Sequence, residues 1–246
     1  MHLSIAHLYP NTMNTYGDDG NIICLTKRCA WRGITTTVFT IDIGDHIPKE
    51  VDLYFFGGGQ DAAQSSLVSD LHKKAARLHS DINSGTPLLA ICGGYQLLGR
   101  TYHPFDGKTL EGISVFPVET RASLKRMTGN VVVKANAQLG LPNEHSSIVG
   151  FENHSGKTRI AQNSSTHPLG IIRHGYGNNG SDHTEGCVIH NAIGCYLHGS
   201  LLPKNPHLAD WLLQKACARH DSNYTLPPLD DTLEWAAHDT IVGRYT

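Results

Sequence analysis

The stretch Pro87-Leu88-Leu89-Ala90-Ile91-Cys92-Gly93-Gly94-Tyr95-Gln96 decides how this chain folds. It reads as a buried strand that stops at a cysteine, followed at once by two glycines and a segment able to start a helix. So tight a turn needs small residues around its apex, and it lifts the apical side chain out of the sheet above backbone N–H donors. A cysteine held there can attack a carbonyl carbon. The alternative is a buried structural cysteine, but the glycine pair favours a nucleophile at Cys92.

Upstream of this stretch, apolar runs alternate with amphipathic patterns. Strands are expected over residues 3–8, 35–41 and 51–56, and helices from residue 18 or 19 to 31 and over 66–83. This rhythm predicts an α/β fold in three layers, with a mostly parallel sheet flanked by helices. Reactive groups in such folds lie at the carboxyl ends of strands, so we expect Gly57-Gly58-Gly59 and Cys92 to face one crevice. On the second helix, Asp70 and Lys74 are expected to form an exposed i,i+4 pair.

Beyond Gly112 the pattern changes. Short β-like runs at 115–119, 131–134 and 170–173 are separated by glycine and asparagine. These runs predict antiparallel additions to the sheet. Residues 176–185 are polar and glycine-rich, which predicts an exposed loop.

The next apolar run, residues 188–197, predicts a last core strand that leads into His198-Gly199. Asn205 and Pro206 then suit the N-cap and the first position of a helix. We expect this helix to end near Arg219.

The length of 246 residues fits one large domain, which we place at residues 1–222. Residues 223–246 form a tail with a Pro-Pro step, an acidic patch and Trp235. Two interpretations of the tail stay open. It is either a docking segment for a partner chain or a surface helix packed on its own domain.

Composition excludes several classes of function. The formal net charge of −2 gives no basic field for nucleic acid. The N-terminus lacks the pattern of a signal peptide and no apolar stretch is long enough to span a membrane, so the cytoplasm is the expected compartment. The six cysteines include no CxxC pair, so we expect neither a disulfide framework nor a metal site.

A cysteine nucleophile needs a base to form thiolate near neutral pH. Of the 16 histidines, His198 is the best candidate because it follows a predicted core strand and precedes a glycine. His190 is the alternative, but we expect it in the middle of the same strand, where a side chain rarely reaches an active-site rim.

Backbone N–H donors for an oxyanion are expected from two places. One is the glycine run, with Gly58 and Gly59, and the other is Gly93, directly after the nucleophile. Each such donor contributes roughly 3 kcal/mol to a tetrahedral intermediate. The alternative interpretation of the glycine run is a plain strand-to-helix turn.

One segment imitates a phosphate-binding loop without matching it. Residues 150–158 contain Ser-Gly-Lys-Thr, but the first glycine of the motif should stand at 151, where Phe151 lies. No amphipathic helix follows Thr158. We therefore do not expect this chain to bind ATP itself.

Together, four motifs resemble glutamine amidotransferase domains of the cobyric acid synthase type. They span most of the chain in family order and are Gly57-Gly58-Gly59-Gln60-Asp61, Ile91-Cys92-Gly93-Gly94-Tyr95-Gln96, Gly150-Phe151-Glu152-Asn153-His154 and Tyr196-Leu197-His198-Gly199. The resemblance implies a class I glutamine amidotransferase-like fold. It is closest to the branch of glutaminase subunits that serve lipid II isoglutaminyl synthases.

The resemblance implies a two-chain enzyme, a heterodimer with a Mur-ligase-like synthetase. This chain would hydrolyse L-glutamine, without a cofactor of its own, and pass on ammonia. The partner would use ATP and Mg²⁺ to activate the α-carboxyl of D-glutamate in lipid II, which ammonia converts to D-isoglutamine. A corrinoid-type acceptor, a stand-alone Cys-His hydrolase and a non-catalytic module of the same fold are the rival interpretations.

The family pattern makes Cys92 the nucleophile and His198 the base. It places the arginine that holds glutamine at Arg126, with Arg121 as a competitor. Many amidotransferases carry His-x-Glu, whereas Ser200 stands here in place of the glutamate. The cobyric acid synthase type also lacks this carboxylate. An acidic group from the partner chain is one expected source of the missing carboxylate. A second departure is Ala90, where a glycine is common.

Overall fold

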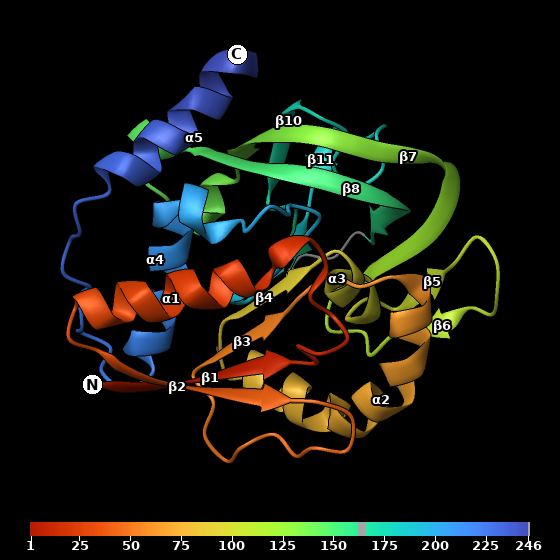
Figure 1. Cartoon of the computed structure of the whole chain (residues 1–246), viewed down its shortest axis with the longest axis horizontal. Helices are drawn as coiled ribbons and strands as arrows, with labels where there is room; N and C mark the ends of the chain where they lie inside the picture. Colours follow the sequence, from red (N-terminus) through yellow and green to blue (C-terminus); the bar gives the residue numbers. More distant parts are fainter. Residues whose placement is uncertain (162–165, 246) are drawn as a thin grey trace.

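A computed structural model describes residues 1–161 and 166–245, and its first sheet has seven strands (Figure 1). Their order across the sheet is β2 (Thr35–Ile41), β1 (His2–Leu8), β3 (Leu53–Phe56), β4 (Leu88–Ile91), β13 (Ala192–Cys195), β12 (Cys187–Ile189) and β9 (Thr166–His167). The first five are parallel, and β12 and β9 are antiparallel. The mostly parallel sheet with antiparallel additions is thus confirmed.

Helices cover both faces of this sheet because successive residues of a strand point to opposite faces. On one face, Leu3, Ile5 and their counterparts in β3 and β4 pack against α1 (Asp19–Trp31) and α4 (Pro206–Ala218). On the other face, Ala6, Leu8 and the alternate strand residues pack against α2 (Asp61–Asn83) and α3 (Gly93–Leu97). The strands are therefore buried on both sides, as continuous apolar runs predict.

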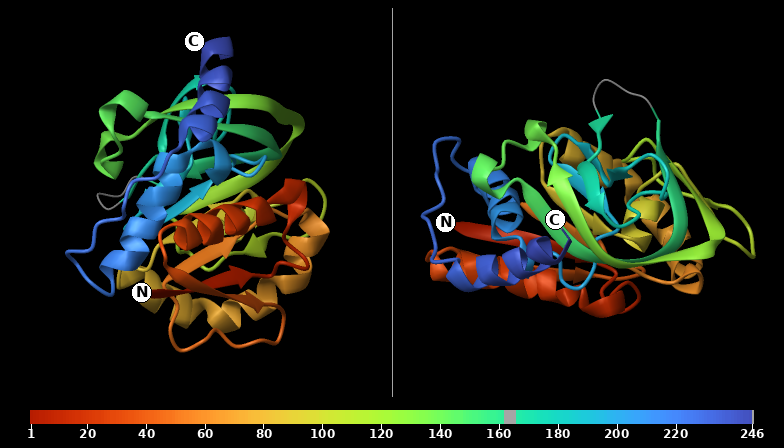
Figure 2. Two further views of the ribbon diagram at one scale, coloured as in Figure 1. Left: turned by 60° about the vertical axis from the view of Figure 1, so that its left-hand side comes forward. Right: turned by 90° about the horizontal axis from the view of Figure 1, so that it is seen from above.

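A second, six-stranded sheet lies on one side of the first (Figure 2). Its path is β11 (Thr184–Glu185), β10 (Gly170–His174), β7 (Val118–Ala135), β5 (Thr101–His103) and β6 (Leu110–Glu111), with β8 (Ser147–Ile160) paired to β7. The short runs expected at 115–119 and 131–134 therefore belong largely to one 18-residue strand, β7. Its partner β8 includes the segment that imitates a phosphate-binding loop.

Three details correct the sequence-based expectations. The second helix begins at Asp61, five residues before the apolar periodicity starts, and its Asp70–Lys74 pair is buried. The loop 176–185 is exposed only in part, since Glu185 at its end is fully buried. The Asn205 side chain bonds the backbone of Val149 on β8 and makes no cap to the helix that follows.

A fourth correction concerns the run 188–197, which is a hairpin and not one strand. Strands β12 and β13 pair antiparallel, and His190 lies in the turn between them with a φ of 51°. Residue His190 is thus separated from His198 by the whole length of β13. It does not line the cavity described below.

The C-terminal segment packs on its own domain. Helix α5 (Thr232–Tyr245) contacts the 3₁₀ turn η4 (Leu202–Lys204) and strands β7 and β8. Its Trp235 ring stacks on His145 at 3.6 Å, and its buried His238 bonds the Lys204 carbonyl. The structure shows this helix packed on its own domain, and docking of a partner chain on the tail stays a prediction. No described helix combines the length and apolar character needed to cross a membrane.

Candidate active site

Cys92 lies at the apex of the turn between β4 and α3, with φ 49° and ψ −103°. A non-glycine residue rarely adopts positive φ, so such strain points to a constrained functional position. The two residues that follow must be glycines, because a side chain at either position would clash with neighbouring backbone. A Cβ on Gly93 would lie 2.8 Å from the Gly59 carbonyl oxygen, and one on Gly94 would lie 2.7 Å from that of Phe56. The expected elbow is confirmed.

The remaining five cysteines are unsuited to nucleophilic chemistry. They are Cys24, Cys29, Cys187, Cys195 and Cys217, all free thiols. Burial raises the pKa of each of these thiols, to about 12 for Cys24, Cys29 and Cys187. A thiol held protonated in this way is inert.

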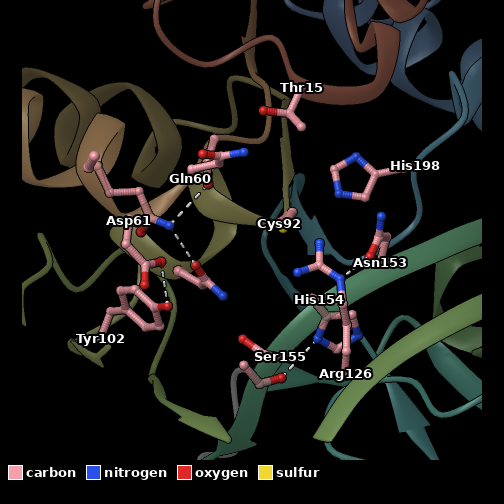
Figure 3. Close-up of a pocket in the computed structure, with 15 residues that line it drawn as sticks. Thr15, Gln60, Asp61, Cys92, Tyr102, Arg126, Asn153, His154, Ser155 and His198 are labelled. Atoms are coloured by element: carbon pink, nitrogen blue, oxygen red, sulfur yellow. Dashed lines mark hydrogen bonds between the residues drawn. The ribbon is translucent and has the colours of Figure 1, made fainter. Parts of the chain in front are cut away.

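His198 follows β13 and faces the Cys92 side of the cavity (Figure 3). Its backbone pairs with Phe151 of β8, the His198 N–H donating at 2.8 Å and its carbonyl accepting at 3.2 Å. The residue is 1 % exposed. Burial alone would lower the pKa of this imidazole, but the charge of Cys92, the hydrogen bonds to Asp18 and Cys92 and the charge of Asp18 raise it to about 10.

An acidic residue of this same chain contacts His198. Asp18, just before α1, is fully buried, and its Oδ1 lies 3.2 Å from His198 Nδ1. A carboxylate from a partner chain is therefore not needed to fill this position. Sequence reasoning treated Asp18 only as an acidic helix start, since nothing in the Gly17–Gly20 run marks a partner 180 residues away.

The same carboxylate corrects one oxyanion expectation. The Gly58 N–H donates to Asp18 Oδ2 at 2.7 Å, so it is occupied and does not point to a ligand. Gly59 and Gly93 remain the candidate donors. They abut each other beside the nucleophile, since a Cβ on Gly93 would lie 2.9 Å from the Gly59 nitrogen.

Around Cys92 lies a cavity of about 320 Å³. Figure 3 shows Asp61 and Tyr102 on one side of Cys92, and Arg126 and Asn153 on the other. The Tyr102 hydroxyl donates to Asp61 Oδ1 at 2.7 Å, which fixes that carboxylate. A polar cavity with a carboxylate on one wall and a guanidinium on the other suits a small zwitterion.

Of the two candidate arginines, only Arg126 lines the cavity. It lies just before Met127, where the pairing of β7 with β8 resumes after a break in register from Ala122. Its Nε donates to Asn153 Oδ1. Arg121 precedes the break, pairs in register with Lys157 and is exposed.

Beneath the cavity, a chain of buried polar groups fixes the floor. Gln64 donates to Gln96, which donates to the Tyr196 hydroxyl at 3.2 Å. The ring of His154 stacks on Tyr196 at 3.6 Å, and His154 Nδ1 donates to the Gly156 carbonyl. Sequence reasoning placed His154 in a motif but gave it no role. No group of three or more described His, Cys, Asp or Glu residues is arranged to hold a metal ion.

Solved structures share this fold. A chain from the PurLQS structure of Thermotoga maritima superposes with a TM-score of 0.60 at 13 % identity. The match covers 90 % of this chain and 100 % of that one. The glutaminase domain of Trypanosoma brucei CTPS with bound acivicin superposes with a TM-score of 0.57 at 11 % identity. The match covers 92 % of this chain and 96 % of that one. The fold is that of the class I glutamine amidotransferases.

Sequence comparison gives the family within that class. The profile of the CobB/CobQ-like glutamine amidotransferase domain matches residues 4–206. The GatD subunit of lipid II isoglutaminyl synthase from Staphylococcus aureus is 38 % identical, over 99 % of this chain and 97 % of that protein. The GatD subunit from Streptococcus pneumoniae is 37 % identical, over 94 % and 87 %. The chain belongs to the CobB/CobQ-like glutamine amidotransferase family.

Proposed function

We propose that this chain is the glutamine-hydrolysing subunit of a lipid II isoglutaminyl synthase. The observation that carries the proposal is Cys92 at a strained turn beside His198, in a cavity bordered by Arg126. The full-length similarity to two GatD subunits supports the cell-wall reaction.

In the proposed mechanism, the Cys92 thiolate attacks the carboxamide carbon of glutamine. The N–H groups of Gly59 and Gly93 hold the oxyanion of the tetrahedral intermediate. His198 then gives its proton to the departing ammonia and activates a water molecule, which cleaves the glutamyl thioester to glutamate.

The two charged walls of the cavity give specificity for a free amino acid. Arg126 holds the α-carboxylate, and Asp61, fixed by Tyr102, takes the α-ammonium. Glutamine within a peptide lacks both charges, so the site selects the free amino acid.

The released ammonia serves a Mur-ligase-like synthetase that binds this chain as a heterodimer. That partner holds ATP and Mg²⁺ and activates the α-carboxyl of D-glutamate in lipid II. Ammonia then forms D-isoglutamine, and this chain reaches the lipid-linked substrate only through its partner. The cytoplasm, where free glutamine and ATP meet, is the proposed compartment.

The test measures glutamate release from L-glutamine by the wild-type chain and by Cys92→Ala, each with and without the co-purified synthetase. We expect slow release by the wild-type chain alone, faster release with the partner, and none from Cys92→Ala. Undiminished release by Cys92→Ala contradicts the mechanism. Conversion of lipid II to its amidated form by the pair tests the acceptor.

A corrinoid-type acceptor is the second candidate, because cobyric acid synthases are also similar. The one from Desulforudis audaxviator is 39 % identical, but over 47 % of this chain and only 22 % of that protein. The near full-length match to the GatD subunits favours lipid II. A stand-alone Cys-His hydrolase would show no stimulation by a synthetase.

A further inference from the structure

We propose that Asp18 is a positioning residue whose single carboxylate sets both the catalytic base and the oxyanion loop. This proposal rests on the proposed glutaminase function. It assigns to helix α1 the task that a glutamate performs in His-x-Glu amidotransferases, where this chain has Ser200.

The two oxygens of Asp18 have separate tasks. Oδ1 lies 3.2 Å from His198 Nδ1, and Oδ2 accepts the Gly58 N–H at 2.7 Å. A carboxylate is acceptor-only, so His198 carries its proton on Nδ1 and turns Nε2 away from Asp18. Because the Gly58 N–H is bound to Asp18, Gly59, which lines the cavity, is the candidate donor from the glycine run.

These groups are closely spaced around Gly58. A Cβ on Gly58 would lie 2.7 Å from His198 Cε1, 3.2 Å from Asp18 Oδ2 and 3.4 Å from Cys92 Cβ. The glycine loop, the base, the carboxylate and the nucleophile are therefore in contact around one point. A movement of Asp18 would displace both His198 and the glycine loop, because it bonds to each.

Asp18 itself is clamped to the segment that carries His198. The Ser200 hydroxyl donates to the Gly17 carbonyl at 2.8 Å. A Cβ on Gly20 would lie 2.1 Å from Ser200 Oγ, so the first turn of α1 presses directly on this segment. On the other side, the Thr15 N–H donates to the Gly58 carbonyl at 3.0 Å. The loop before α1 thus joins the base to the glycine run.

In chemical terms, Asp18 stabilises the imidazolium that forms when Cys92 loses its proton to His198. Without the carboxylate, the neutral thiol–imidazole pair gains population and the wrong tautomer of His198 becomes accessible. Loss of the orienting carboxylate in a comparable triad lowers turnover by roughly 10⁴-fold while the geometry persists.

The test compares Asp18→Asn with Asp19→Asn, a matched control at the neighbouring exposed carboxylate, which bonds Asn14. Glutaminase kinetics are measured with the synthetase bound. We expect Asp18→Asn to lower kcat at least roughly 100-fold, with KM within about threefold because the cavity walls are untouched. Asp19→Asn should match the wild type.

A second readout is independent of glutamine. The rate of Cys92 alkylation by iodoacetamide, followed from pH 5 to 9, reports the thiolate. We expect Asp18→Asn to react more slowly at neutral pH, with its midpoint moved to higher pH, while Asp19→Asn keeps the wild-type profile. A merely structural role would not move this midpoint in a folded variant.

Two results would overturn the proposal: a wild-type alkylation profile in Asp18→Asn, or a wild-type kcat in that variant with the synthetase bound. If Asp18→Asn does not fold, Ser200→Ala carries the test, and an unchanged alkylation profile there is equally adverse. If the wild-type chain hydrolyses no glutamine but Asp18→Asn still shifts the alkylation midpoint, only the proposed function is contradicted.

Discussion

Arg28 in α1 and the partly buried Asp231, which lies just before α5, form an ion pair with Nη1 and Oδ1 2.6 Å apart. The Arg28 side chain is 2 % exposed, and it also makes two hydrogen bonds to Asp210 of α4. One guanidinium thus joins the first helix, the last core helix and the C-terminal segment. The segment after residue 222 is tied to the domain at this point.

The first prediction concerns this cluster. Arg28→Met removes the buried cation and leaves Asp231 without its ion-pair partner, while Asp210 keeps its pair with Arg32. Breaking a pair at a buried charge costs about 3–5 kcal/mol. We expect a loss of that size in the free energy of unfolding, measured by urea denaturation. Arg77→Met is the control, because Arg77 forms a partly exposed i,i+4 pair with Asp81 and should cost less than about 1 kcal/mol. Equal losses of unfolding free energy in Arg28→Met and Arg77→Met would contradict the stabilising role given to the Arg28 cluster.

The second prediction is a pH dependence at Glu185. Burial raises the pKa of this carboxyl to about 8 from 4.5. Since the folded state holds the proton more tightly, the stability it contributes is full below pH 4.5 and is lost as pH rises to 8. The slope is on the order of 1 kcal/mol per pH unit.

Glu185→Gln should remove this dependence, because a neutral amide can still accept the N–H of Tyr196. We expect the variant to be more stable than the wild type at pH 9 and close to it at pH 5, as measured by thermal unfolding. Parallel pH profiles for the two proteins would refute the protonated carboxyl.

The third prediction tests the close packing at the base. Gly58→Ala places a methyl group 2.7 Å from His198 Cε1, so the imidazole must move. Misplacement by about 1 Å costs roughly 100-fold in rate, and we expect such a loss in kcat with an unchanged circular dichroism spectrum. Gly243→Ala in α5, where a Cβ meets nothing within 4 Å, should leave kcat unchanged.

The fourth prediction tests recognition of the free amino acid. Arg126→Ala and Asp61→Asn each remove one charge from the cavity wall, and a hydrogen bond to a charged group contributes about 1.5–3 kcal/mol. We expect KM for glutamine to rise roughly tenfold to a hundredfold in each variant. Arg121→Ala lies outside the cavity and should retain the wild-type KM. A rise in KM for Arg121→Ala alone would reverse the assignment.

The elements that sequence predicted well are those whose signals are local. The β-branched run at 35–41 matches β2 to the residue, and the turn at Cys92 is encoded by its own glycines. Side-chain periodicity and turn chemistry act over a few residues, so they can be read directly.

What sequence missed depends on distant partners. Nothing near Asp18 indicates a bond to a histidine 180 residues later. Likewise, the turn at His190 looks like the interior of a strand, because the residues on both sides are equally apolar. The length of β7 is missed for a related reason. The residues around Arg126 are polar and exposed, and the pairing with β8 that continues the strand joins residues distant in sequence.

Strand β13 pairs with β4, Ile193 opposite Leu89, although the whole second sheet lies between them in the chain. Proteins are synthesised from the N-terminus, so a growing chain displays its thiol long before the ribosome adds His198. Strand β13, whose Cys195 carbonyl accepts the Cys92 N–H, is also absent until that stage of synthesis. A product that stops before His198 therefore lacks both the catalytic base and the strand that supports the nucleophile, and it cannot hydrolyse glutamine.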